Sequence, residues 1–249
     1  MTVPDDLAAL DAASAAGRRP PGRFPAPPPP GVRPGRAGLK GAWAALEPLD
    51  PRVHAEALFA AAHAAGDRGA AVFAMLPYGP WPDVAAMIPW LRGCAGSADP
   101  LFFVLRDRAS GAAMGMAAFM EMRPADGVVE IGNIWIGPAF QRSRAATDAL
   151  AAMMRHVLDD CGCRRLEWKT NALNTASRRA ALRLGFRYEG TFLNHKVIDG
   201  VSRDTAWYSI LDSEWPGVRA ALDRWLDPAN FDAAERQRES LAAVTRALW

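Results

Sequence analysis

The segment from residue 137 to residue 147 combines small side chains with positive charge in a way that suits an anion. It reads Gly137-Pro138-Ala139-Phe140-Gln141-Arg142-Ser143-Arg144-Ala145-Ala146-Thr147. The apolar run Val128–Ile136 predicts a strand before it, and the apolar spacing of Ala145–Leu158 predicts a helix after it. A helix N-terminus offers unpaired backbone N–H groups and the positive end of its dipole. With Arg142 and Arg144 alongside, this order indicates a phosphate site, although many such loops are only connectors.

A second strand, loop and helix follow in the same order. Arg165–Thr170 is expected to form the strand and Thr175–Leu184 the helix. Asn174 stands directly before this helix, where asparagine is a favoured cap. Ser177 lies in the first turn, where a serine hydroxyl also bonds with backbone groups. Both polar residues therefore have a structural interpretation beside any role in binding.

Two linked stretches of the chain resemble the GNAT acetyltransferases. Residues 128–136 and 141–149 are similar to the family's central strand and pyrophosphate loop, whose signature is Arg/Gln-x-x-Gly-x-Gly/Ala. Gln141 and Ala146 match that signature, and Arg144 stands where its middle glycine is expected. Residues 174–190 are similar to the family's Asn-x-x-Ser…Leu-Gly-Phe…Glu-Gly segment. The detail resembles the branch that contains the N-terminal acetyltransferases of ribosomal proteins, and the resemblance covers about Ala42–Trp215.

The resemblance implies that acetyl-CoA is the cofactor. In this family the thioester lies where two parallel strands splay apart, which here would be Asn133–Ile136 and Trp168–Asn171. Backbone groups freed by the splay would bond the pantetheine arm and polarise the thioester carbonyl. The implied cofactor-binding residues are Ile134, Trp135, Ile136, Gln141, Arg142, Ser143, Arg144, Ala145, Ala146, Thr147, Asn171 and Asn174.

The resemblance also implies catalytic roles, each with a structural alternative. Glu130 is the candidate base that accepts the amine proton, or else a structural carboxylate paired with an arginine. The helix before Gly185 carries Ala181 where many relatives have a tyrosine acid, so Ser177 is the remaining candidate to assist the departing thiolate. Tyr78 and Trp81 follow the first helix in a region that shapes the acceptor site in this family, although tryptophan is often a core residue.

The expected elements imply an α/β (α+β) GNAT fold, with a mixed sheet flanked by helices and a splayed pair of parallel strands. We expect a Pro/Gly-rich flexible arm over residues 1–40, whose removal leaves stability nearly unchanged. The acetyltransferase domain would span residues 41–214. A helical extension over residues 215–249 would follow, with one helix over Asp232–Leu248 as a packing or homodimer element.

Composition excludes some classes of function and leaves two open. The formal charge of +2 indicates neither nucleic acid nor a membrane as a partner. Three cysteines and four scattered histidines offer no metal-ligand spacing, and we expect a cytoplasmic protein without a metal. The main hypothesis is an N-acetyltransferase that acts directly on an amine, either a peptide N-terminus or a small molecule. The alternative is a non-catalytic acyl-CoA-binding regulator. A dinucleotide-binding fold is disfavoured, because no Gly-x-Gly-x-x-Gly turn follows the strand.

Overall fold

The chain folds into two compact units, which we describe separately. The computed structural model describes residues 4–18, 29–63, 71–198 and 200–249. The central unit comprises Arg33–Arg123 and Val129–Cys161. The terminal unit comprises Met1–Val32, Pro124–Val128 and Gly162–Trp249, so that both ends of the chain belong to it.

Five strands form the sheet of the central unit, in the order β1-β2-β3-β4-β5. They are β1 (Leu39–Lys40), β2 (Ala44–Pro48), β3 (Leu101–Asp107), β4 (Ala113–Arg123) and β5 (Val128–Ile136). The pairs from β1 to β4 are antiparallel, and β3 is held in register by pairs such as Phe102 with Ala118. β3 and β4 are buried on both faces, which explains their nearly continuous apolar sequence.

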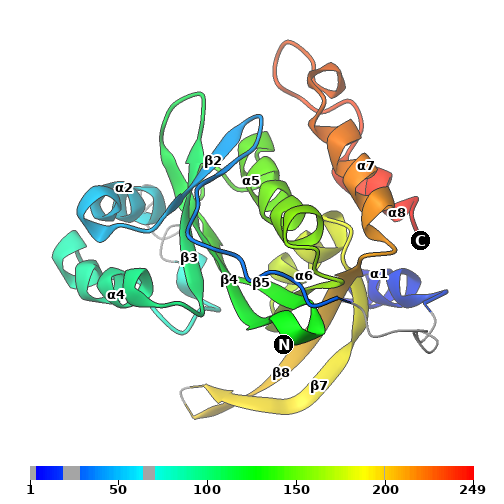
Figure 1. Cartoon of the computed structure of the whole chain (residues 1–249), viewed down its shortest axis with the longest axis horizontal. Helices are drawn as coiled ribbons and strands as arrows, with labels where there is room; N and C mark the ends of the chain where they lie inside the picture. The colour runs from blue at the N-terminus through cyan, green and yellow to red at the C-terminus, as the bar shows by residue number, and fades with distance from the viewer. Residues whose placement is uncertain (1–3, 19–28, 64–70, 199) are drawn as a thin grey trace. The chain divides into compact units, whose positions relative to one another are not determined.

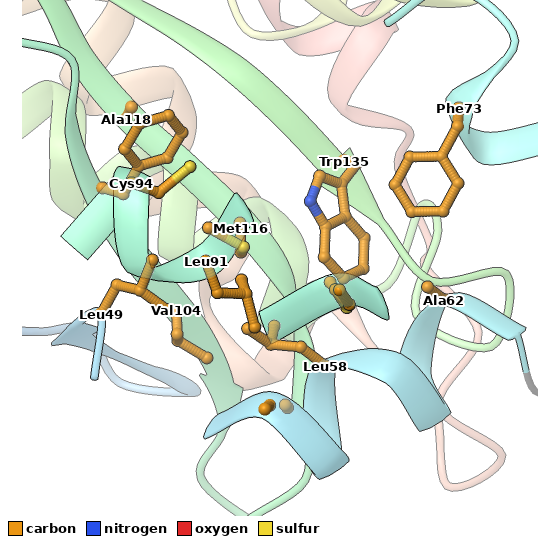
Figure 2. Packing of buried hydrophobic residues seen from close by; sticks show 14 residues of the cluster. Leu49, Leu58, Ala62, Phe73, Leu91, Cys94, Val104, Met116, Ala118 and Trp135 are labelled. Atoms are coloured by element: carbon orange, nitrogen blue, oxygen red, sulfur yellow. The ribbon is translucent and has the colours of Figure 1, made fainter. Parts of the chain in front are cut away.

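Helices cover both faces of this sheet (Figure 1). α2 (Pro51–His63) and α4 (Val84–Gly96) pack on one face, where Phe102, Val104 and Met116 join their core. Figure 2 shows this core, in which Leu58 and Leu91 lie beside Val104 and Met116. α5 (Arg144–Arg155), which continues into the π-helical turn His156–Asp160, packs on the other face. Alternate strand residues therefore supply two separate cores.

A three-stranded antiparallel sheet, in the order β6-β8-β7, forms the centre of the terminal unit. The strands are β6 (Arg165–Asn171), β7 (Arg187–Ile198) and β8 (Val201–Leu211). α6 (Thr175–Arg183) packs on β6 and β7, while α7 (Trp215–Leu226) and α8 (Leu241–Arg246) pack on each other. The short helices are η1 (Ala71–Phe73) in the central unit, and η2 (Pro124–Asp126) and η4 (Pro228–Asn230) in the terminal unit.

The N-terminal segment differs from the flexible arm expected from the sequence. Asp5–Ala15 forms helix α1, which packs against β7 and α6 of the terminal unit. Leu7 is fully buried, and the carboxylate of Asp11 forms a buried ion pair with Arg178. Residues 29–40 are described, with β1 at their end, whereas 19–28 lie outside the described residues. Partners more than 160 positions away therefore order α1, which local composition cannot indicate.

The mixed α/β fold expected from the sequence is confirmed, with one local difference near the C-terminus. The expected helix over Asp232–Leu248 is confined to α8, because the side chain of Asp232 accepts backbone N–H bonds from Ala234 and Arg236 in a turn. Splaying of the expected parallel pair remains a prediction, since β5 and β6 belong to different units. No helix among the described residues is long and apolar enough to cross a membrane. All three cysteines are buried free thiols.

Candidate active site

A break in β5 brings the polar residues of this strand into one place. Asn133 has a φ of 49°, a left-handed conformation that interrupts the regular pleat. Its amide nitrogen donates to the sulfur of Met120, at 3.5 Å. Glu130 is 4% exposed, and a Cβ atom at Gly132 would lie 3.3 Å from its Oε1 and 2.5 Å from the Met120 sulfur. Glycine at position 132 thus leaves room for a buried carboxylate beside the break.

The hydroxyl of Tyr78 reaches the same break from the loop between α2 and α4. It donates to Oδ1 of Asn133 at 3.4 Å, a long bond. The ring of Tyr78 lies 4.4 Å from that of Trp90 and 6.2 Å from that of Trp81, so aromatic neighbours fix its direction. Burial raises the pKa of Tyr78 well above its usual value of 10, with Cys94 adding to the shift, which keeps its phenol protonated.

Trp81 and Trp135 belong to the same aromatic group around Phe73. The ring of Phe73 lies 5.2 Å from that of Trp81 and 5.5 Å from that of Trp135. Trp135 is only 2% exposed, and Figure 2 shows its ring within the apolar core. Of the predicted cofactor residues on β5, Ile134 and Ile136 are half-buried, whereas the side chain of Trp135 is a core residue. Any contact of Trp135 with a ligand would have to use its backbone.

The loop after β5 is fixed at its start and exposed at its middle. The backbone N–H of Gly137 donates to Met114, and a Cβ at this position would overlap the carbonyl of Ala61. The side chain of Gln141 turns back to donate to the carbonyl of Ile136, at 3.1 Å. Gln141 therefore closes the loop with its side chain, although the residue is exposed.

Arg142, Ser143 and Arg144 form the entry to α5. Ser143 is the helix cap, and its hydroxyl accepts from the N–H of Ala146 at 3.1 Å. Arg144 is the first helical residue, so a side chain at the family's glycine position costs no left-handed strain. Arg142 carries the left-handed conformation instead, with a φ of 63°, and is exposed. The guanidinium of Arg144 lies 3.5 Å from the centre of the Trp43 ring.

A buried carboxylate behind this entry ties α5 to the start of β2. Asp148 is 1% exposed and accepts backbone N–H bonds from Trp43 at 2.6 Å and Ala44 at 3.0 Å. Desolvation raises the pKa of Asp148, although these bonds and Arg155 oppose the shift. Asp148 thereby fixes Trp43, on which Arg144 stacks. The predicted residues Ala145, Ala146 and Thr147 form the buried first turn of α5.

The second strand, loop and helix lie in the terminal unit. Oδ1 of Asn171 accepts from the N–H of Leu173 at 2.9 Å, which folds the chain into a turn. Asn174 caps α6 by accepting from the N–H of Ser177 at 3.0 Å. The hydroxyl of Ser177 accepts from the indole of Trp168, also at 3.0 Å. The capping interpretation of Asn174 is therefore observed, whereas the hydroxyl of Ser177 bonds with an indole and not with the backbone groups expected. Each side chain keeps a donor for another partner.

A group of paired charged side chains joins β6 and β7 to Arg18 and Glu214. Arg165 bonds with Glu167 at 2.7 Å and with Glu189 at 2.6 Å, and Arg18 bonds with Glu214 at 2.5 Å. Burial disfavours ionisation of these glutamates, but the arginine bonds outweigh it and lower the pKa of all three. Their charges are neutralised locally.

Sequence reasoning missed four residues of the central unit that shape the candidate site. They are Trp43, Met120, Asn133 and Asp148. Asn133 and Asp148 carried a signal, because each is polar within an otherwise apolar face. Met120 and Trp43 carried none, since their roles depend on contacts with distant parts of the chain. Among the described residues, no group of three or more His, Cys, Asp or Glu side chains could hold a metal ion.

Comparison with known proteins gives one consistent result. Residues 45–187 match the model of the acetyltransferase (GNAT) domain. A GCN5-related N-acetyltransferase from Brucella melitensis is 43% identical, with a TM-score of 0.84, over 87% of this chain and 97% of that one. A structure from Chromobacterium violaceum ATCC 12472, named as a GNAT-family acetyltransferase, is 33% identical, with a TM-score of 0.71, over 80% of this chain and 98% of its own.

A curated relative points in the same direction over a shorter length. YdaF of Bacillus subtilis (strain 168), named as a ribosomal N-acetyltransferase, is 26% identical over 109 residues. That alignment covers 44% of this chain and 59% of YdaF, so the chain spans about three fifths of this relative. The resemblance inferred from residues 128–190 is thus supported by whole-chain structural similarity as well as by sequence.

Proposed function

Because the chain belongs to the GNAT acetyltransferase family, we propose that it transfers an acetyl group from acetyl-CoA directly to a primary amine. The observation that carries the proposal is the entry to α5, where Ser143 caps the helix and Arg142 stands exposed beside its N-terminus. This entry lies within the residues that match the family model.

The residues at this entry fit the pyrophosphate of CoA. Arg142 offers a guanidinium in a loop held by Gly137 and Gln141, and the first turn of α5 offers backbone N–H groups. Ile134 and Ile136 on β5 would hold the arm of the cofactor. The family resemblance also implies contacts with the cofactor at Asn171 and Asn174. Acetyl-CoA would supply the acetyl group as a thioester, whose carbonyl the backbone at the β5 break would polarise.

Glu130 would take the proton of the attacking amine. Its carboxylate lies beside the break at Asn133, in the room that Gly132 leaves. The proton would pass to a carboxylate oxygen of Glu130, directly or through a water molecule. Ser177 would assist the departing thiolate, because its oxygen accepts from Trp168 and its own hydroxyl proton can be donated.

The acceptor would lie against the aromatic loop of the central unit. Tyr78 and Trp81 are half-buried and are fixed by ring contacts with Phe73 and Trp90. An amine next to Tyr78 would be close to Asn133 and hence to the β5 break. The relative named as a ribosomal N-acetyltransferase favours a peptide N-terminus as the acceptor, with small amines as the second class.

Two measurements test this function. Calorimetric titration with CoA should show binding, and no binding at millimolar CoA would refute the proposal. A panel of peptides with different N-terminal residues and of small amines should then show thiol release that depends on acetyl-CoA and on the acceptor. Binding without release on any acceptor would instead favour the non-catalytic regulator, for which Ala181 in place of the family's tyrosine is the supporting feature.

A further inference from the structure

One buried arginine donates into the turn formed by residues 171–174. Nη1 of Arg178 donates to the carbonyl of Ala172 at 2.7 Å, inside the turn. Nε of the same guanidinium donates to the hydroxyl of Tyr208 at 3.0 Å. Arg178 is 4% exposed and Tyr208 is fully buried, so water competes little for these bonds. The turn also has bonds of its own, from the N–H groups of Leu173 and Asn174 to Asn171, and Arg178 adds the bond that ties it to the buried guanidinium.

Helix α1 supplies the counter-charge that fixes this arginine. Oδ2 of Asp11 accepts from Nη2 of Arg178, and Oδ1 of Asp11 accepts from the Tyr208 hydroxyl at 2.8 Å. Asp11 is 2% exposed. A buried arginine that loses the carboxylate of Asp11 must find another arrangement, because an uncompensated charge in this environment is costly. Moving the guanidinium would break its bond with Ala172.

Further contacts hold α1 at this place. The guanidinium of Arg187 donates to the carbonyls of Ser14 and Ala16 at the end of the helix. The hydroxyl of Ser14 accepts from the N–H of Tyr188 at 3.0 Å. Both partners lie on β7, so α1 is fixed on the strand side as well as on α6. Its position is thus determined independently of the Asp11 pair.

We propose that Asp11 is a positioning residue, which acts through Arg178 to keep the 171–174 turn in the conformation that binds the cofactor arm. The proposal rests on the proposed function, which assigns Asn171 and Asn174 to that arm. It extends the site to α1, which lies outside the residues that match the family model. The N-terminal helix would then tune affinity for the cofactor without touching it.

Two substitutions on the same helix form a matched test. Asp11→Asn removes the buried counter-charge, whereas Asp6→Asn makes the same chemical change in an exposed pair with Arg179, at 2.8 Å. Asp11→Asn should weaken CoA binding about tenfold and raise the KM for acetyl-CoA, with kcat and the KM for the acceptor nearly unchanged. Asp6→Asn should behave as the unsubstituted protein does.

Amide hydrogen exchange of residues 171–178 reads the turn without any ligand. Exchange there should be faster in Asp11→Asn and unchanged in Asp6→Asn. If Asp11→Asn melts at a lower temperature but keeps both its CoA affinity and its exchange rates, the pair is only structural and the proposal is overturned. If exchange accelerates while the unsubstituted protein does not bind CoA, the proposed function fails and the positioning role stands.

A second variant covers the case in which Asp11→Asn does not fold. Arg178→Lys keeps the charge opposite Asp11 but loses the planar fork that joins Ala172, Tyr208 and Asp11. It should show the same loss of CoA affinity and the same faster exchange. Unchanged affinity and exchange in this variant would overturn the proposal just as clearly.

Discussion

Two strand–loop–helix segments of this chain share a cap and differ in what surrounds the loop. Ser143 accepts from the N–H three residues later, and Asn174 does the same. The loop before Ser143 is exposed at Arg142. The turn before Asn174 is pinned by Arg178 from within the helix that it caps, and through it by α1. Both helices therefore begin with the same kind of cap. The contacts around each loop leave the loop before Ser143 open to a ligand and hold the turn before Asn174 in place.

The largest effect should come from the strand that leads into the open loop. Glu130→Gln keeps the size of the side chain but removes its basicity. We expect turnover to fall by about a hundredfold to ten-thousandfold at pH 7, with CoA binding retained. An α-amino acceptor has a pKa of about 8, so raising the pH should restore part of the rate by deprotonating it in solution. Steady-state kinetics against pH measure both. Normal turnover at pH 7 with a verified acceptor would leave Glu130 as a structural carboxylate.

A substitution that removes the arginine holding the turn before Asn174 should lower the free energy of unfolding. Arg178→Ala leaves Asp11 as a buried charge without its arginine, and should lower the free energy of unfolding by about 3–5 kcal/mol. Arg179→Ala, next in sequence, breaks only an exposed pair with Asp6 and should change the free energy of unfolding little. Denaturant unfolding of both variants measures the contrast. Equal losses of unfolding free energy in the two variants would mean that the pair between α1 and Arg178 stabilises the protein no more than a surface pair does.

A smaller effect is expected at the open loop itself. Arg142→Glu reverses a charge next to the α5 N-terminus and should weaken CoA binding by about tenfold, with little change in stability. Arg236→Glu reverses an exposed charge in the C-terminal segment and serves as the control. Calorimetric titration of both variants compares them. If the two bind CoA equally, the α5 entry does not hold the pyrophosphate.

The smallest effect concerns pH, and the two units should respond with opposite sign. The lowered pKa of Glu214 means that its stabilisation is present above the ordinary value of 4.5 and is lost as pH falls through the lowered value. The raised pKa of Asp148 means that its contribution is fullest below 3.8 and declines as pH rises through the raised value. The free energy of unfolding of the unsubstituted protein minus that of Glu214→Gln should therefore become smaller on acidification. The same difference taken with Asp148→Asn should become larger. Denaturant unfolding at pH 7 and at about pH 3 compares them, and parallel changes would contradict this assignment.

The sequence was sufficient where local pattern decides structure. The bounds of β5 were predicted because an apolar run follows a glycine turn, and the cap at Asn174 was predicted from residue type alone. It was insufficient where distant partners decide. The left-handed residue of β5 is Asn133 and not the neighbouring Gly132, and α1 is ordered by an arginine 167 positions away. Likewise, only the backbone conformation shows that Arg144 lies in the first helical turn and that Arg142 is left-handed.

The three buried cysteines have a practical consequence for assays of this protein. Cys94, Cys161 and Cys163 are each at most 7% exposed. Burial raises the pKa of Cys94 to about 11 and also raises that of Cys163, so these two thiols hold little thiolate near neutral pH. A thiol-reactive dye added to the native protein should therefore report free coenzyme with a low protein background. The same dye should give a late, three-equivalent signal only after denaturant is added, which provides an internal calibration of protein concentration.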